Sequence, residues 1–411
     1  MKARTQSWWE ATHTSFWFLP TVIAVVAAAL ALGIVWLDRS VSLEGERLSD
    51  FFYPGGPEGA REVLSTIAGS IITVAGVVFS VTIVALTTAA GQFGPRLLRS
   101  FMADKGNQVV LGTFVGTFIY CLLVLRTIKG TEDEEFVPKI AVTLGIALAL
   151  ASFAVLIYFF HRASSSIQAE QVVDTIFREL EQEIDHTFPA QQDPQEPAPT
   201  DSPLSALFGP GRRTAAVLAD ASGYLRVVDV DSLTAVARER DLVLRLEYRS
   251  GDFVFEGTPL AEVAGADDHD VHVHKQVRQA FILGKYRSLE QDVEFPIQQL
   301  VDMALRALSP SLNDPYTAVN CIDRLGAALC HLSARHPPSP YQYDQEGNLR
   351  VILDVPTYAG ILDAAFNQIR QNSQRSLAVC LRLLEALQAI AVTVGRDSQR
   401  EAVRLHAEIV Y

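Results

Sequence analysis

A stripe of hydroxyl-bearing and small residues runs along one apolar segment of the chain. At about 100° per residue on a helix, its members fall within an arc of about 80°. They are Ser65, Gly69, Thr73, Gly76, Ser80, Thr87 and Gly91. The opposite side of the same segment carries large aliphatic residues such as Ile71 and Val78. One side of this helix is therefore suited to close packing or to contact with water, and the other side is suited to an apolar core.

Two interpretations of the stripe stay open. Small residues let helix backbones approach closely and hydroxyls bond across a helix interface, so the stripe is a possible packing surface. On a symmetry-related set of helices it is equally a possible pore lining, with a ring of glutamates that favours cations at its mouth. The pore-lining candidates are Glu62, Ser65, Gly69, Thr73, Gly76, Ser80, Thr87, Gln92 and Arg96. Gly112 and Gly116, on a later apolar segment, predict helix packing alone.

A second group of polar residues lies within an apolar frame between residues 287 and 325. It contains Asp292, Gln299, Asp302, Arg306, Asn313 and Asp314. These residue types suit an acid–base or ligand site, but a structural network of ion pairs and helix caps is the nearer explanation. Asn313 and Asp314 before Pro315 are a typical helix-start signal.

The sequence predicts neither a metal site nor a cofactor nor an enzyme. His269 and His272 belong to the run DDHDVHVH, and they would share one face of a helix capped by Asp267 or Asp268. No CxxC or HExxH pattern accompanies them. The chain also has no P-loop, nucleophile elbow or dinucleotide-binding glycine motif.

Four apolar segments are long enough to cross a bilayer core of about 30 Å. They cover about 16–37, 64–90, 108–128 and 137–160. Residues 1–162 are therefore expected to form a four-helix transmembrane domain. Lys and Arg gather before the first segment, between the second and third, and after the fourth, and the other two loops are acidic. This distribution predicts that both termini are cytoplasmic.

The rest of the chain is expected to form an α+β cytoplasmic region. A helical extension over 163–188 and a flexible linker over 189–211 precede a β module over 212–265. A mainly helical domain over 266–411 follows, with a hairpin near 343–354. After residue 161 the chain carries 23 Lys and Arg against 35 Asp and Glu, out of 34 and 47 in total. This acidic balance argues against a nucleic-acid partner.

Two resemblances add to this interpretation. The segment from Ser222 to Val263, with Gly251, Asp252 and Gly257 at a tight turn, resembles the barrel-sandwich hybrid fold of biotinyl and lipoyl domains. No Lys occurs between Ala206 and His274, so the carrier lysine of that fold is missing. The segments FSVTIVALTTAAGQFGPRLLRSF and RSLEQDVEFPIQQLVDMALRALSPSLNDPYTA resemble a bacterial predicted membrane-protein family, domain of unknown function 2254. That resemblance implies a bacterial inner-membrane protein and assigns no reaction.

Taken together, the sequence favours a homo-oligomeric, cation-favouring channel lined by the second apolar helix and regulated by a cytoplasmic ring. Its expected partners are the lipid bilayer, further copies of the chain and inorganic ions. The alternative is a membrane-anchored scaffold or sensor whose barrel docks a partner protein.

Overall fold

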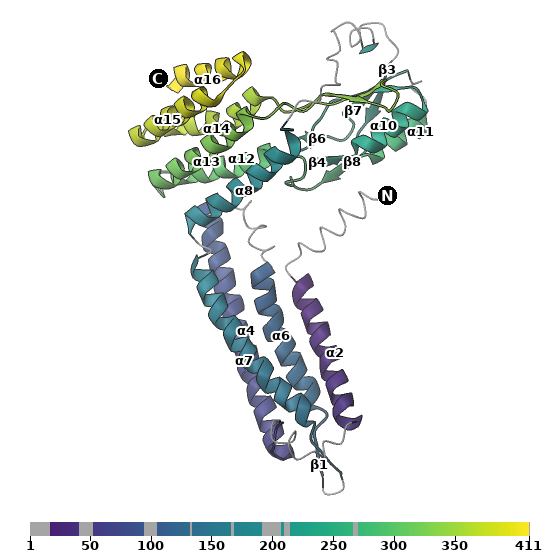
Figure 1. Cartoon of the computed structure of the whole chain (residues 1–411), viewed down its shortest axis with the longest axis vertical. Coiled ribbons are helices and arrows are strands. Elements are labelled where there is room, and N and C mark those ends of the chain that lie inside the picture. The colour runs from purple at the N-terminus through teal and green to yellow at the C-terminus, as the bar shows by residue number, and fades with distance from the viewer. Residues whose placement is uncertain are drawn as a thin grey trace. The chain divides into compact units, whose positions relative to one another are not determined.

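The computed structural model describes residues 17–40, 52–93, 105–131, 134–165, 168–190, 207–208, 214–265 and 270–410. The chain divides into two compact units, Met1–Gln168 and Ala169–Tyr411, which we call unit 1 and unit 2. Figure 1 labels their elements. In the described part of the chain, four helices are long and apolar enough to cross a membrane, and all four belong to unit 1.

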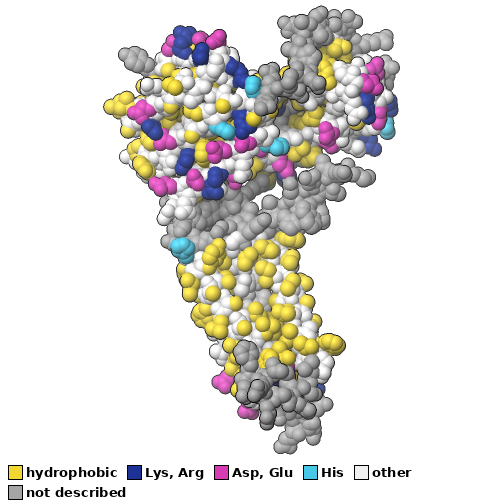
Figure 2. Space-filling model, in the orientation of Figure 1, with side chains coloured by type: hydrophobic (Ala, Val, Ile, Leu, Met, Phe, Trp, Pro, Cys, Tyr) yellow, Lys and Arg dark blue, Asp and Glu magenta, His cyan; other side chains and the backbone are white. Residues whose placement is uncertain are grey.

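Unit 1 is a bundle of long helices joined at one end by a short hairpin. The helices are α2 (Phe18–Ser40), α4 (Pro57–Phe93), α6 (Lys105–Leu125) and α7 (Lys139–Ser165). The hairpin pairs β1 (Lys129–Thr131) with β2 (Glu134–Phe136). Helix α6 packs against each of the other three helices. Yellow apolar side chains cover the face of this bundle seen in Figure 2, whereas charged side chains gather on unit 2. Lipid suits such a surface, because a bilayer offers no hydrogen bonds to side chains.

The contact between α2 and α6 depends on two glycines. A Cβ atom at Gly112 would lie 2.6 Å from Ile23 Cδ1 and 3.1 Å from Pro20 Cα. A Cβ atom at Gly116 would lie 3.3 Å from Ala27 Cβ. The packing role predicted for these glycines is confirmed, since a Cβ atom would clash at Gly112 and would be unusually close to its neighbours at Gly116.

Polar contacts hold the hairpin end of the bundle together. The carboxylate of Asp38 accepts hydrogen bonds from the backbone N–H groups of Ile140 (3.1 Å) and Ala141 (2.9 Å). It thereby satisfies two of the donors that the first turn of α7 leaves without an intrahelical partner. Tyr120, which is buried in α6, donates to the Ala141 carbonyl oxygen at 2.9 Å. These hydrogen bonds connect α2, α6 and α7, which are distant from one another in the sequence.

Unit 2 has a β lobe and a helical lobe. The β lobe holds a five-stranded sheet in the order β3-β7-β5-β10-β9 and a three-stranded sheet in the order β6-β4-β8. Its strands are β3 (Thr214–Leu218), β4 (Gly223–Val228), β5 (Val243–Leu246), β6 (Phe253–Val254), β7 (Pro259–Ala264), β8 (Phe281–Gly284), β9 (Tyr341–Tyr343) and β10 (Leu349–Ile352). Helices α10 (Val230–Glu239) and α11 (Val271–Gln279) complete it.

The barrel-sandwich resemblance of the β module is not confirmed. Helix α10 occupies part of the segment that the resemblance assigned to strands, and an Asp229 N-cap fixes its start. The sheets also recruit β8, β9 and β10, all from beyond residue 265. Strand β10 pairs in parallel with β5, through Val351 and Leu244. A strand from far along the chain therefore completes the sheet, and local pattern does not reveal it.

The helical lobe consists of six helices. They are α8 (Ala169–Thr187), α12 (Glu294–Ala307), α13 (Pro315–Ser333), α14 (Tyr358–Ser373), α15 (Leu377–Thr393) and α16 (Asp397–Val410). Helix α8 packs on α12 and α13 through Val173, Ile176, Leu180 and Ile184, which are buried along one side. Most of the expected linker over 189–211 lies outside the described residues.

A matched pair of substitutions compares a glycine at the α2–α6 contact with a glycine of the α4 stripe. Gly116→Ile is expected to destabilise the monomer by about 1–3 kcal/mol, because the new side chain overpacks the α2–α6 contact. Gly76→Ile is the control, since a Cβ atom at Gly76 meets nothing within 4 Å. The measurement is the unfolding free energy of monomeric protein in detergent. Equal destabilisation by both variants would contradict this assignment.

Candidate functional site

Helix α4 exposes its stripe and buries its opposite face. The buried residues pack against α6 and α7, and they are Ala60, Leu64, Ala68, Ile71, Ala75 and Val78. The exposed residues are Glu62, Ser65, Gly69, Thr73, Gly76, Ser80 and Thr87. The stripe is thus no packing surface between the described helices of this chain. The side chain of Gln92 and the whole of Arg96 lie outside the described residues.

The two threonines of the stripe donate their hydroxyl protons within their own helix. Thr73 Oγ1 donates to the Gly69 carbonyl oxygen at 2.8 Å, and Thr87 Oγ1 donates to that of Val84 at 2.9 Å. Such back-bonding lets a threonine face an apolar environment without another donor or acceptor. It leaves the oxygen lone pairs directed outward, where they can accept from water or interact with a cation.

The polar group expected between residues 287 and 325 is not a single site. Asp314 caps α13 by accepting from Thr317 N–H at 3.2 Å, with Pro315 as the first helical residue, as the helix-start signal predicts. Asn313 takes a positive φ of 47° just before that cap. Gln299 is buried in α12, while Asp302 and Arg306 are half-buried on the same helix. Asp292 belongs to a different cluster.

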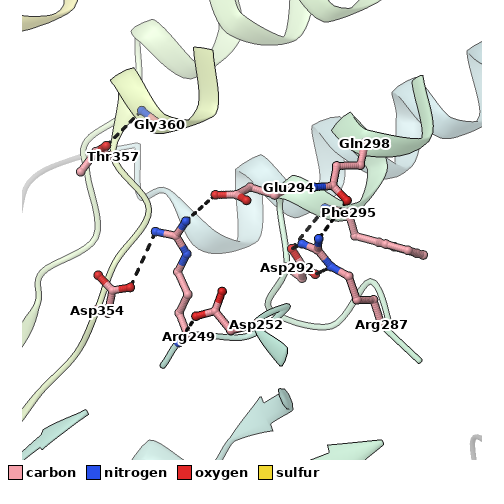
Figure 3. A network of polar contacts seen from close by, with 10 residues as sticks. All are labelled: Arg249, Asp252, Arg287, Asp292, Glu294, Phe295, Gln298, Asp354, Thr357 and Gly360. Atoms are coloured by element: carbon pink, nitrogen blue, oxygen red, sulfur yellow. Dashed lines mark hydrogen bonds and ion pairs between the residues drawn. The ribbon is translucent and has the colours of Figure 1, made fainter. Parts of the chain in front are cut away.

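Asp292 pairs with Arg287, five residues earlier in the chain, which the expected polar group does not include. The guanidinium donates from Nε and Nη2 to the two carboxylate oxygens, both at 2.8 Å (Figure 3). Only 3 % of the Asp292 side chain is exposed. Burial raises the pKa of this carboxyl above its ordinary value, and the arginine opposes the rise. The bidentate pairing stabilises the charged Asp292 carboxylate at a buried position where an unpaired charge would be unfavourable.

The absence of a side chain at Gly251 leaves space for this ion pair. A Cβ atom there would lie 2.4 Å from Asp292 Oδ2 and 2.7 Å from Arg287 Nη2. The residue also has a φ of +98°, which side chains rarely allow. Gly251, which the barrel-sandwich resemblance placed at a tight turn, therefore serves as the contact point between the β lobe and the start of α12.

A second arginine joins the two lobes beside this pair. Arg249, in the loop after β5, contacts Glu294 at the start of α12 through Nη2 at 2.6 Å. Its Nη1 lies 3.8 Å from Asp354 Oδ2, an ion-pair distance longer than a hydrogen bond. Burial raises the pKa of Glu294, and Arg249 works against that rise. Figure 3 shows the Arg249 side chain between the two carboxylates, one from each of two lobe-crossing segments.

The helix expected over the histidine run is present, but its start and its cap differ from the prediction. Helix α11 begins at Val271, and its cap is Asp270, not Asp267 or Asp268. Asp270 accepts from the N–H groups of His272 and Val273 and so fixes the start. His272 is exposed, while Asp267, Asp268 and His269 lie outside the described residues. Within the described residues, no three His, Cys, Asp or Glu side chains gather as metal ligands would.

Fold and surface together define a multi-pass helical membrane protein that carries a large mixed α/β unit outside its bundle. The chain belongs to the family described as "Predicted membrane protein (DUF2254)", whose profile matches residues 13–389. It is similar to uncharacterized proteins of Mycobacterium bovis and of Mycobacterium tuberculosis strain H37Rv. Each is 36% identical over 409 residues, which cover 96% of this chain and 75% of the relative. No solved structure matches the chain.

Removing the guanidinium of Arg287 tests how much the buried Arg287–Asp292 pair contributes to stability. Arg287→Gln is expected to lower the unfolding free energy of unit 2 by about 3 kcal/mol, because Asp292 is left charged and buried without its partner. The control is Arg404→Gln, which removes an exposed arginine that pairs within α16 and is expected to change little. Chemical unfolding of the full chain in detergent, followed by circular dichroism, measures both. Equal stabilities for the two variants would contradict a structural role for the pair.

Proposed function

We propose that the protein is a homo-oligomeric channel of the bacterial inner membrane, with α4 helices around a central axis. The observation that carries this proposal is the exposed stripe of α4, which the described helices of the same chain leave uncovered. An equivalent stripe on each copy would meet at the axis, while the buried faces anchor each α4 to its own bundle. A polar lining over the membrane depth is what a water-filled path requires.

The charge pattern favours passive movement of cations. The sequence carries no Asp, Glu, Lys or Arg from residue 63 to residue 95. Coupled transporters usually rely on an ionisable relay or a broken helix near the midplane, and α4 is continuous from Pro57 to Phe93. Glu58 and Glu62 are exposed at the start of α4, where a ring of carboxylates would attract cations. The proposal contains no catalytic step.

The orientation of the channel follows from its loops. The short loops rich in Lys and Arg would face the cytoplasm, together with both termini and unit 2. Unit 2 would then form a cytoplasmic ring that regulates the path. Its acidic composition agrees with partners other than nucleic acid.

A second candidate function is a membrane-anchored scaffold that docks a protein through the β lobe. An aromatic ladder on the three-stranded sheet favours it. The rings of Tyr224 and Phe253 lie 5.0 Å apart edge to face, as do those of Phe253 and Phe255. Phe255 is 60% exposed and Phe253 41% exposed. Exposed aromatic groups of this kind are typical anchors of protein interfaces.

Ion flux into sealed liposomes distinguishes the two functions. Thr73→Leu and Ser80→Leu are expected to reduce cation flux by at least about tenfold, because a bulky apolar residue narrows and dries the path. Val77→Leu is the matched control, since Val77 is exposed outside the stripe. The oligomeric state of each variant is measured in parallel. Absence of flux in the wild-type protein under all salts and voltages, with the oligomer intact, would reject the channel and favour the scaffold.

A further inference from the structure

A cleft of about 240 Å³ lies between the two lobes of unit 2. Its walls come from the end of α8, the loop after β5, the segment before α12 and the segment between β10 and α14. The segments before α12 and after β10 are also connections by which the chain crosses from one lobe to the other. A ligand here would touch both lobes at their hinge, which is a common location for small-molecule sites.

The cleft combines apolar walls with a few charged groups. Val230, Leu246, Val293, Leu353 and Val355 supply aliphatic surface. Arg249, Glu294 and Asp354 supply charged groups and His186 supplies an imidazole, while Asp292 is paired with Arg287 from outside the lining. Ligand pockets typically have this composition, in which apolar contact provides affinity and a few polar groups fix orientation.

The balance of charges around the cleft indicates whether a cationic or an anionic ligand is favoured. Arg249 contributes one positive charge, and Glu294 and Asp354 contribute two negative charges. Asp252 adds a further carboxylate close by, since it accepts from the Arg249 backbone N–H at 2.9 Å. An anion would therefore enter a region of surplus negative charge, whereas a cation would complete the pairing of Asp354. The Asp354 side chain is 53 % exposed and is therefore accessible to a ligand.

Backbone strain at the cleft is a separate observation. Gln291 has a φ of +56°, in the left-handed region that a non-glycine residue rarely occupies. Its amide oxygen accepts from Val228 N–H at 3.1 Å, and its amide nitrogen lies 3.4 Å from the Val228 carbonyl oxygen. These bonds to β4 hold Gln291 in place. Strained residues held by their surroundings occur preferentially at ligand clamps.

We propose that this cleft binds a small organic cation, a protonated amine with a short apolar body. The ammonium group hydrogen-bonds to Asp354 beside Glu294, and the apolar body lies against Leu353, Val355 and Val230. The volume is smaller than the roughly 300–1,000 Å³ of drug-sized sites, which favours a ligand of only a few heavy atoms. Bound amine competes with Arg249 for Asp354 and thereby alters a contact between the lobes. The proposal is independent of whether α4 conducts ions.

Thermal unfolding of the full chain in detergent tests the proposal, with n-butylammonium chloride as the probe. A thiol-reactive dye reports exposure of Cys321, which is buried in α13, in a background in which the other three free cysteines, Cys121, Cys330 and Cys380, are replaced by Ala. The unfolding midpoint is expected to rise with butylammonium and to saturate, because a ligand that binds only the folded state stabilises it. Sodium chloride at the same ionic strength and sodium butyrate are the comparison salts, and neither is expected to reproduce the effect.

Substitutions identify the site. Asp354→Asn is expected to raise the half-saturating butylammonium concentration about tenfold or more, since it removes the charged hydrogen-bond acceptor. Asp397→Asn is the control, because Asp397 is an exposed carboxylate on α16. A midpoint that responds no more to butylammonium than to sodium chloride would overturn the proposal. So would a response to butyrate that Asp354→Asn strengthens and Arg249→Gln abolishes, since that result assigns the cleft to an anion.

Discussion

Helix α4 has two faces, and the described helices of the chain cover only one of them. The covered face supplies Leu64, Ala68, Ile71 and Ala75 to the core of the bundle, so the helix cannot turn about its axis without losing that burial. This constraint fixes the direction of the stripe. Ser65, Thr73 and Ser80 must then face lipid, another copy of the chain, or water. Every functional interpretation of unit 1 depends on which of these three it is.

In unit 2, the β lobe and the helical lobe are joined by chain segments that cross between them. Two ion-pair groups lie at these crossings. Arg287 and Asp292 form a closed pair against Gly251, whereas Arg249 is shared between two carboxylates, one of them at a long distance. The first pair holds the junction together and the second leaves an incomplete contact beside a cleft. A lobe junction of this kind is suited to regulation, since small changes in ion pairing there alter the relation of two packed bodies.

The proposed channel and the proposed amine site are compatible but separate. One rests on the exposed side of a membrane helix, and the other on charge balance between two lobes of unit 2. If both hold, a small organic cation would act on the unit that regulates a cation path. If only the cleft binds, unit 2 is a sensor, and the aromatic ladder of Tyr224, Phe253 and Phe255 offers a surface through which it could report to a partner.

The four apolar helices, the polar stripe on one of them and the cap at Asp314 can all be predicted from the amino-acid sequence. These features depend on residues within a few turns of one another, which composition and period reveal. The folded structure is needed to see that the described helices leave the stripe uncovered, that β10 pairs with β5, and that Arg249 lies between Glu294 and Asp354. Each of these depends on segments that are distant along the chain. No local pattern in the sequence encodes which distant segment a side chain will contact, because that choice is made by the packing of the whole unit.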